Sequence, residues 1–444
     1  MRSRAMRRAT ARYLWDRMKV SLWFVPLVMA LAAFCLSGLL GRLDEHVPNV
    51  ILNNSNFFIA GSATEMRAIM IGVAGTILAT TGVVFSLLTL PLSTVASQFG
   101  SRLLRVFMRD RTTQFVLGTF VGTFCYCLAT ALSIPNRPQT AAPQISVTFG
   151  LILTLATFAS LIALIQHISI MLQAPNIVAS AGAELMNVIR SESSDEAGES
   201  QSRSVPERSG TGSLVESEAY PLRLTKTGYI QFVDPQIVLN LAQENDLIIH
   251  LLRKPGQFVW SGVTAALVWP KAKVDERLIK HLQRAIQVGN QRTPVQDVEY
   301  AINQLVEVAV RAMSPAINDP FTALTCLDYL IDGLVSYVRS GEINPNIYDD
   351  DGKLRLIFEP ASAAQLHCSA FDMLRHASCD NASVLLHMLN TLRVIGREAK
   401  SPELRQELLR HVSLIQAESQ VSDLVEQDRQ AIRLRCESLQ AGLG

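Results

Sequence analysis

The segment AIMIGVAGTILATTGVVFSLLTLPL, residues 68–92, decides what class of fold this chain adopts. Its 25 residues contain no Asp, Glu, Lys or Arg, and aliphatic side chains dominate it. A helix of about 20 apolar residues crosses the ~30 Å hydrocarbon core of a bilayer, because all of its backbone hydrogen bonds are internal. The segment therefore predicts a transmembrane helix.

Three further uncharged segments accompany it, over residues 22–40, 113–134 and 145–165. Hydrophobic residues make up 49% of the chain and charged residues only 18%, which is less charge than a soluble protein usually carries. Four buried helices of a soluble protein are one alternative. A cleaved signal peptide in place of the first span is another, but no clean cleavage motif follows it. We therefore expect an α-helical membrane domain with four transmembrane helices over residues 22–172.

The distribution of Lys and Arg sets the expected orientation of these spans. The first 21 residues carry seven of them, and the connection between the second and third spans carries four. The other two connections hold three in total. Positively charged connections stay on the cytoplasmic side of a membrane. We therefore predict a multi-pass protein of the bacterial cytoplasmic (inner) membrane with both termini in the cytoplasm.

Small and hydroxylated residues follow one face of the second span. They recur at alternating spacings of four and three, at Gly75, Ala79, Gly82, Ser86 and Thr89. Thr119 and Thr123 repeat the pattern on the third span. Small residues let helices approach closely, and hydroxyls form hydrogen bonds between helices. The pattern predicts a helix-packing seam, with a pore wall as the alternative, and we expect a homo-oligomer.

The connection after the second span predicts a contact with lipid. In FGSRLLRVFMRD, residues 99–110, three arginines share one helical face, namely Arg102, Arg105 and Arg109. Such a helix lies at the bilayer surface with its charges among anionic headgroups. A plain basic loop is the alternative.

The rest of the chain divides by composition into a connection and two subdomains. A connecting helix and a disordered linker rich in Ser, Glu and Gly are expected over residues 173–219. A small α/β subdomain is expected over residues 220–272, and a helical subdomain over residues 273–444. Together they form a mostly helical cytoplasmic α+β domain. The basic residues 1–21 form a separate cytoplasmic N-terminus.

Several local features follow from the same patterns. GYIQFV predicts a strand, and Asp234 is expected to cap the helix that follows it. FVWSGVTAALVW predicts a single strand, and DERLIKHLQRAIQVG a helix that ends at Gly289. The spacing of Thr293 and Gln296 predicts a capping box at the start of the next helix.

The stretch VRAMSPAINDPFTAL, residues 310–324, contains more helix-ending and helix-capping residues than a simple turn between helices requires. Pro315 ends one helix, and Pro320 fits the first turn of the next. The candidate residues of this corner are Arg311, Ser314, Asn318 and Asp319. Asn318 or Asp319 is expected to cap the second helix, and an internal clamp between Arg311 and Asp319 is the favoured interpretation. An anionic ligand bound at the helix N-terminus is the alternative.

No enzymatic motif is visible in the sequence. By residue type, the candidates for a metal site are His367, Cys368, His376 and Cys379. Their spacing fits no compact zinc motif, and the neighbouring apolar residues predict a packed helix. The seven cysteines form no CxxC pair, which is typical of a reduced, intracellular protein. We expect no catalytic activity, cofactor, metal or nucleic-acid partner.

Two longer stretches, residues 292–324 and residues 97–128, carry a resemblance to a known family. With SPAINDPFTA in the first and SQFGSRLLRVFMRD in the second, they resemble the signatures of bacterial predicted membrane proteins known only as a domain of unknown function. GYIQFVD and RKPGQFV fit the soluble half of that family. The sequence departs from the family at Gly100 and Ser101, where a proline usually follows the Ser-Gln-Phe turn. The resemblance implies this architecture and no established activity.

Two functions of different kinds remain open on the sequence alone. The first is a channel-like or gating protein in which the interfacial arginine helix couples the cytoplasmic domain to the small-residue spans. The second is a membrane-tethered sensor or scaffold whose spans only anchor and oligomerise. The transported species, the ligand, the signal and the subunit number are not encoded in any recognisable pattern.

Overall fold

The structure is a computed structural model that describes residues 23–46, 61–98, 110–134, 143–193, 216–341 and 343–443. The chain divides into two compact units, an N-terminal unit, Met1–Ile177, and a C-terminal unit, Val178–Gly444. The basic N-terminus and most of the expected linker lie outside the described residues. The same holds for Arg102, Arg105 and Arg109 of the expected interfacial helix.

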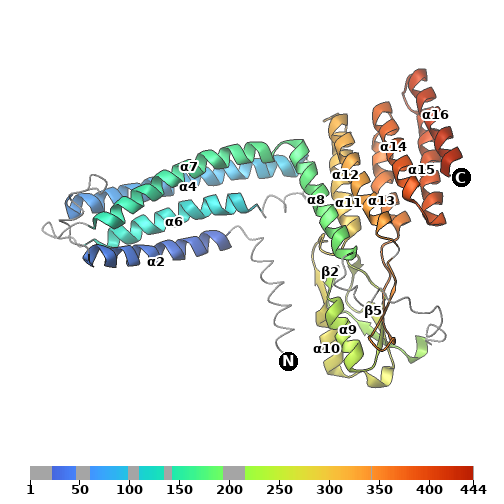
Figure 1. Ribbon diagram of the computed structural model, residues 1–444, viewed down its shortest axis with the longest axis horizontal. Coiled ribbons are helices and arrows are strands. Elements are labelled where there is room, and N and C mark those ends of the chain that lie inside the picture. The colour runs from blue at the N-terminus through green and yellow to red at the C-terminus, as the bar shows by residue number, and fades with distance from the viewer. Residues whose placement is uncertain are drawn as a thin grey trace. The chain divides into compact units, whose positions relative to one another are not determined.

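The N-terminal unit consists, in its described part, of four long helices that lie side by side (Figure 1). They are α2 (Phe24–His46), α4 (Ala63–Gln98), α6 (Arg111–Ser133) and α7 (Gln144–Met171). Each predicted span falls on one of these helices, and each helix extends past the predicted span at one end or both. All four are long and apolar enough to cross a membrane.

Helix α6 forms the centre of this unit, because its contacts with α2 and α4 are more extensive than those of α7 and more of its residues are buried than in any of the other three helices. Its close approach to α2 depends on Gly118, where an added Cβ would collide with the side chain of Met29. On another side, Tyr126 and Cys127 pack in one apolar cluster with Met66 and Met70 of α4. The unit is therefore built around α6 and held by apolar contacts on several of its faces.

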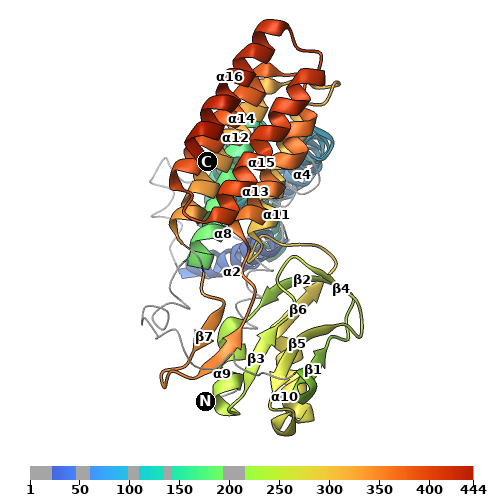
Figure 2. The ribbon, with the colours of Figure 1, turned by 90° about the vertical axis from the view of Figure 1, so that its right-hand side faces the viewer.

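Among the described residues of the C-terminal unit, eight strands form two sheets (Figure 2). The five-stranded sheet has the order β1 (Tyr220–Arg223), β5 (Thr264–Trp269), β3 (Ile248–Leu251), β8 (Leu354–Ile357) and β7 (Asn346–Tyr348). The three-stranded sheet has the order β4 (Phe258–Val259), β2 (Gly228–Val233) and β6 (Ile286–Gly289). All pairings are antiparallel except that of β3 with β8. Two short 3-10 turns, Glu216–Glu218 and Lys271–Lys273, lie beside these strands in the sequence.

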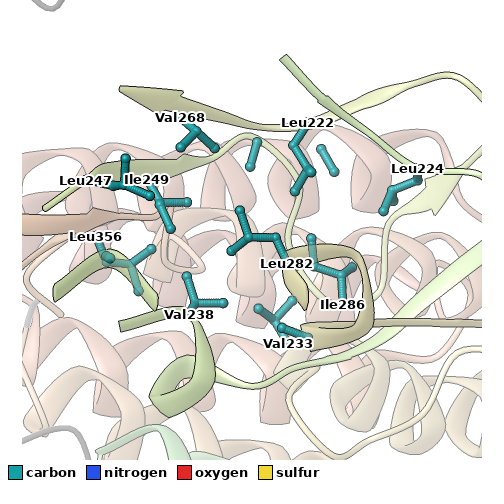
Figure 3. Packing of buried hydrophobic residues seen from close by; sticks show 14 of the residues in the cluster. Leu222, Leu224, Val233, Val238, Leu247, Ile249, Val268, Leu282, Ile286 and Leu356 are labelled. Atoms are coloured by element: carbon teal, nitrogen blue, oxygen red, sulfur yellow. The ribbon is translucent and has the colours of Figure 1, made fainter. Parts of the chain in front are cut away.

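Two helices complete the core of this sheet region, α9 (Pro235–Glu244) and α10 (Glu276–Ala285). Val238 of α9 and Leu282 of α10 are buried in one cluster with residues of the strands, among them Ile249 and Leu356 (Figure 3). As expected, Asp234 caps α9, since its carboxylate accepts a hydrogen bond from the Ile237 N–H at 3.0 Å.

Seven further helices complete the described part of the chain, and all but the first turn of the earliest one belong to the C-terminal unit (Figures 1 and 2). They are α8 (Ala174–Ser193), α11 (Val298–Ala312), α12 (Pro320–Arg339), α13 (Ala363–Ala377), α14 (Ala382–Glu398), α15 (Pro402–Val421) and α16 (Glu426–Leu443). Contacts run between α11 and α12, α11 and α13, α12 and α14, and α15 and α16. The expectation of an apolar helical part followed by a mixed helix and strand part is confirmed.

Two expected elements are wrong in detail. FVWSGVTAALVW is not one strand: its first residues form β4 and its last form β5, in different sheets. A tight turn separates them at Gly262, whose φ of +91° favours glycine. The helix expected to end at Gly289 stops at Ala285, and the next four residues form β6. Strands β6, β7 and β8 come from beyond residue 273, so the sheets draw on both expected subdomains.

The predicted capping box is also wrong. Helix α11 begins later than expected, and its N-cap is Asp297, which accepts a hydrogen bond from the Tyr300 N–H at 2.9 Å. The Gln296 side chain instead pairs with the backbone of Val233, accepting from its N–H at 2.9 Å and donating to its carbonyl at 3.1 Å. The Thr293 hydroxyl donates to the Gln231 carbonyl. Gln296 and Thr293 thus form their hydrogen bonds with the backbone of β2, which is distant in sequence, and not with the N-terminus of α11.

Candidate functional site

The corner between α11 and α12 is held by local hydrogen bonds. Asp319 is the N-cap of α12, and its two carboxylate oxygens accept from the N–H and the hydroxyl of Thr322 at 3.1 and 2.5 Å. The Asp319 N–H donates to the Ala312 carbonyl at 2.8 Å, and the Asn318 N–H to the Ser314 carbonyl at 2.9 Å. Asn318 lies in the left-handed region with φ +48°, which asparagine tolerates well. The prolines and polar residues between α11 and α12 therefore fix the geometry of a helix-turn-helix corner.

The predicted clamp between Arg311 and Asp319 is not formed in this structure. Arg311 forms an ion pair with Glu307, one turn earlier in α11, with 3.3 Å between the nitrogen and oxygen. Both oxygens of Asp319 are directed to Thr322. A cap three residues away requires little side-chain ordering, which explains why the carboxylate serves the helix start instead of the arginine.

Helix α4 exposes its entire small-residue seam. The five exposed seam residues are Gly75, Ala79, Gly82, Ser86 and Thr89. The face that packs inside the unit carries the buried residues Met66, Met70, Ala74, Ile77 and Val84. At roughly 100° per residue, the two faces point about 150° apart. A Cβ added to either glycine of the seam would meet no described atom of the chain within 4 Å.

Helix α6 uses the same kinds of residue in the opposite way. Thr123 is buried, and its hydroxyl lies 2.8 Å from that of Thr157 on α7. The Thr119 hydroxyl lies 3.1 Å from that of Ser160, also on α7. On the side of α2, Ser37 and Thr130 pair at 2.9 Å. The prediction of close packing with hydrogen bonds between helices thus describes α6 within one copy of the chain.

Two aspartates at helix ends were missed by the sequence reasoning. Asp44, near the end of α2, accepts hydrogen bonds from the N–H groups of Ile145 and Ser146 at 2.8 and 2.9 Å. It therefore caps α7 from another helix. Asp110 caps α6 through the Thr113 N–H at 2.7 Å and contacts His167 of α7 at 3.0 Å. The position of each aspartate beside an uncharged segment was visible, but its partner helix was not.

A partly buried ion pair joins the sheet region to the helices of the C-terminal unit. Arg292 donates two hydrogen bonds of 2.8 Å to Asp297, whose side chain is only 4% exposed. Its guanidinium also contacts Glu299 at 3.3 Å, and Glu299 accepts from Ser369 of α13. Gly256, in the RKPGQFV stretch, lies so close to Asp297 that a Cβ there would collide with the carboxylate. This network brings two sequence motifs together.

A second polar cluster lies between α13 and α15. The metal-ligating atoms of Cys368, Glu407 and His411 lie within 4.8 Å of one another, so these three could hold an ion. However, Arg410 already donates to Glu407 at 2.6 Å and to Asp372 at 2.9 Å. That guanidinium supplies the positive charge a metal would bring, and the cluster is explained as a charge network.

Protonation of the cluster agrees with this interpretation. Burial opposes the charged form of Glu407, but hydrogen bonds led by Arg410 outweigh it, and the pKa of the carboxyl is lowered. Burial, reinforced by the charge of Arg410, lowers the pKa of His411 to about 4. Of the four residues considered from sequence, only Cys368 belongs to the cluster, whereas His367 is buried and hydrogen-bonded through Nδ1 to the Ala363 carbonyl.

Comparisons with known proteins place this architecture in a recognised group. Residues 19–394 match the family described as Predicted membrane protein (DUF2254). An uncharacterized protein of Mycobacterium tuberculosis is 27% identical over 388 residues, which cover 83% of this chain and 71% of the relative. An uncharacterized protein of Mycobacterium bovis matches to the same extent. No solved structure matches the chain.

Proposed function

The chain belongs to the DUF2254 family of predicted membrane proteins, and on that premise we propose that it is a four-span protein of the bacterial inner membrane that assembles as a homo-oligomer. In this proposal the seam of α4 forms the contact between copies. The favoured role is channel-like or gating, with the C-terminal unit as its cytoplasmic regulatory domain. The second candidate is a membrane-tethered sensor or scaffold.

One observation carries the oligomer, namely the composition of the two exposed helix faces. The exposed face of α2 carries large side chains, such as Leu31 and Phe34, which suit contact with lipid tails. The exposed seam of α4 carries glycine, alanine and hydroxylated residues instead. Between helices in a membrane, small residues permit close backbone approach and so favour association. A second copy of the chain is the partner that this face fits.

The proposal of four spans excludes α12 from the membrane-spanning helices. By length and composition α12 is a fifth candidate. Its Asp328 contacts His387 of α14 at 2.7 Å, and it packs against α11, α13 and α14 in the C-terminal unit. Charged groups at the centre of a bilayer are costly, whereas this one has a partner in its own unit. We therefore assign α12 to the cytoplasmic domain.

The seam favours a channel-like role over a purely passive anchor. Ser86 and Thr89 donate their hydroxyl protons to backbone carbonyls of the preceding turn, at 3.2 and 2.9 Å. Their oxygens retain acceptor capacity, which a polar permeant species or a facing helix could use. The seam contains no ionisable residue, so a proton relay through it is not proposed.

Reporter fusions test the topology on which the proposal rests. Fusions at Arg190 should report the cytoplasm, and fusions near Asn54 and Pro138 the periplasm. A cytoplasmic signal at Asn54 would overturn the arrangement of four spans with cytoplasmic termini. A fusion within the loop after α12 separates four spans from five, because a fifth span would move residues beyond it across the membrane.

Ion and solute flux through proteoliposomes separates the two candidate roles. A channel predicts flux for the purified protein that changes when Ser86→Leu fills the seam. A matched variant, Phe34→Leu on the exposed face of α2, should leave flux unchanged. A protein that oligomerises through the seam and yet conducts nothing under any tested gradient would favour the sensor or scaffold.

A further inference from the structure

The polar cluster between α13 and α15 directs three unlike donor atoms at one positively charged nitrogen. Nη2 of Arg410 lies 2.6 Å from Glu407 Oε1 and 3.4 Å from His411 Nε2. The same nitrogen lies 3.7 Å from Cys368 Sγ. The three donor atoms lie within 4.8 Å of one another. A cationic group therefore occupies the point that a carboxylate, an imidazole and a thiol share.

Two packed helices position these donors. Helix α15 carries Glu407 and His411, which are one helical turn apart and so share a face. Helix α13 carries Cys368, with Asp372 one turn further along the same face. Because the donors come from two helices, their spacing in the sequence forms no compact metal-binding motif.

His411 is oriented to bind a cation through Nε2. Its side chain is 0% exposed, and its ring packs against Phe371 in an edge-to-face contact. A guanidinium has no acceptor atom, so Nε2 accepts in the contact with Arg410 and the ring proton lies on Nδ1. Nδ1 has no hydrogen-bond partner among the described residues and lies 3.8 Å from Asp372 Oδ1. A carboxylate behind the second ring nitrogen is the usual support of a metal-binding histidine.

We propose that Cys368, Glu407 and His411 bind a Zn²⁺ ion, which displaces the guanidinium of Arg410 from their centre. Thiolate and imidazole ligands favour zinc over magnesium or calcium, and three protein ligands leave a fourth position for water. The Cys368 thiol releases its proton to solvent on binding, because the thiolate is the metal ligand. One thiolate and one carboxylate then balance the double charge of the ion, as Arg410 balances Glu407 in the charge network.

Arg410 can leave this position without unfolding its surroundings. Its side chain is 40% exposed, whereas the side chain of Glu407 is only 14% exposed. The guanidinium also donates to Asp372 at 2.9 Å, and its several N–H groups allow it to turn outward and keep that partner. The exchange involves residues of the C-terminal unit alone, so the proposal is independent of how the spans assemble.

Titration of the full-length protein with Co²⁺, in mild detergent and a thiol-free reductant, tests the ligand set. Cobalt replaces zinc in such sites, and a thiolate ligand adds an intense charge-transfer absorption in the near ultraviolet. We expect this absorption in the wild type, and its loss when Zn²⁺ is added in excess. Cys368→Ser, which can still donate to Glu407, should abolish it. The matched variant Cys379→Ser, at another half-buried cysteine, should keep it.

Competition with a coloured chelator measures the affinity for zinc and the part played by the arginine. Glu407→Gln should weaken binding by at least the roughly tenfold that follows from loss of an outer-shell partner. Arg410→Gln should tighten binding, because the competing positive charge is removed. Arg405→Gln, at an exposed position on the same helix, should bind zinc like the wild type.

Two outcomes would overturn the proposal. Cobalt binding without the thiolate absorption, equal in the wild type and in Cys368→Ser, would assign the metal to surface groups elsewhere in the chain. Unchanged or weaker zinc binding in Arg410→Gln would contradict displacement of the guanidinium by the ion.

Discussion

Helices α4 and α6 carry nearly the same kinds of small and hydroxylated residue, yet the structure uses them differently. In α6, Thr123 is buried and paired with a hydroxyl on α7, and Gly118 lies against Met29 of α2. In α4 the seam residues are exposed, and a Cβ added at Gly75 or Gly82 would meet no described atom of the chain within 4 Å. The same residue pattern therefore packs α6 against other helices of its own protomer, whereas in α4 it forms an exposed face that a partner could contact.

The difference shows that a small-residue seam specifies close approach but not the identity of the neighbour. Lipid offers helices no hydrophobic driving force toward one another, so association depends on packing and interhelical hydrogen bonds. For α6 those interactions stabilise the fold of one copy. For α4 we propose that they stabilise the assembly, and substitutions on the two helices should then affect different quantities.

The largest effect on protomer stability is expected for Gly118→Leu. The new side chain would occupy the space of Met29, and overpacking of this kind costs about 1–3 kcal/mol or more. Heating in mild detergent, followed by size-exclusion chromatography of the remaining folded protein, measures the loss. Gly38→Leu on α2 is the control, because no described atom lies within 4 Å of a Cβ there. Equal loss in both variants would remove α6 from the centre of the fold.

A somewhat smaller loss of protomer stability is expected for Asp44→Ala, which tests how α2 caps the start of α7. The change removes the cap that α2 provides for α7, including the hydrogen bonds from Ile145 and Ser146. Loss of an N-cap typically costs about 1 kcal/mol. Glu45→Ala, at the exposed neighbouring position, should melt like the wild type. The cap would lose its assigned role if both variants melted alike.

Thr123→Val should destabilise the protomer less than Asp44→Ala, because it removes one hydrogen bond and nearly preserves the shape of the side chain. Interhelical hydrogen bonds in membranes contribute about 0.6 kcal/mol on average. Thr89→Val makes the same change on the exposed seam of α4 and should leave protomer unfolding unchanged. Unfolding in mixed detergent micelles can resolve the pair of variants. An effect of Thr89→Val as large as that of Thr123→Val would contradict the contrast between the helices.

The smallest effect on the protomer is expected for Gly82→Leu, since the added side chain meets no described atom of its own chain. Its unfolding free energy should stay within about 0.5 kcal/mol of the wild type, as for an exposed position. The oligomer should nevertheless dissociate or change size, which light scattering coupled to size-exclusion chromatography detects. A destabilised protomer with an unchanged oligomer would reverse the assignment of the seam.

How much of this could be predicted depended on whether the determining partner was local. The four uncharged segments do form long apolar helices, Asp234 caps α9 as predicted, and Asp319 is the one of the two expected residues that caps α12, because each feature is set by neighbours within a few residues. Gln296 was assigned to a capping box but pairs with Val233, more than sixty positions away. A one-dimensional pattern contains the side chain that can pair, but not the backbone that tertiary folding brings to it.

The candidate sites show the same limit. The cap of α12 was expected at Asn318 or Asp319 and is Asp319, whereas the predicted pairing of Asp319 with Arg311 is replaced by an ion pair between Arg311 and Glu307 of the same helix. The seam of α4 was visible as a period of small residues, but its direction relative to α6 was not. Direction follows from which face buries Met70 and Ile77, and that depends on the packing of all four helices.

Cross-linking in native membranes tests the central claim, that the α4 seam joins copies of this chain, most directly. Gly82→Cys in a cysteine-free background places a thiol at the centre of the seam, and a brief oxidising treatment then joins thiols that face each other. We predict a covalent dimer for Gly82→Cys and none when Cys35, exposed on α2, is the only cysteine. A Gly82→Cys protein that stays monomeric, while Cys35 cross-links, would contradict the claim and place α2 at the interface.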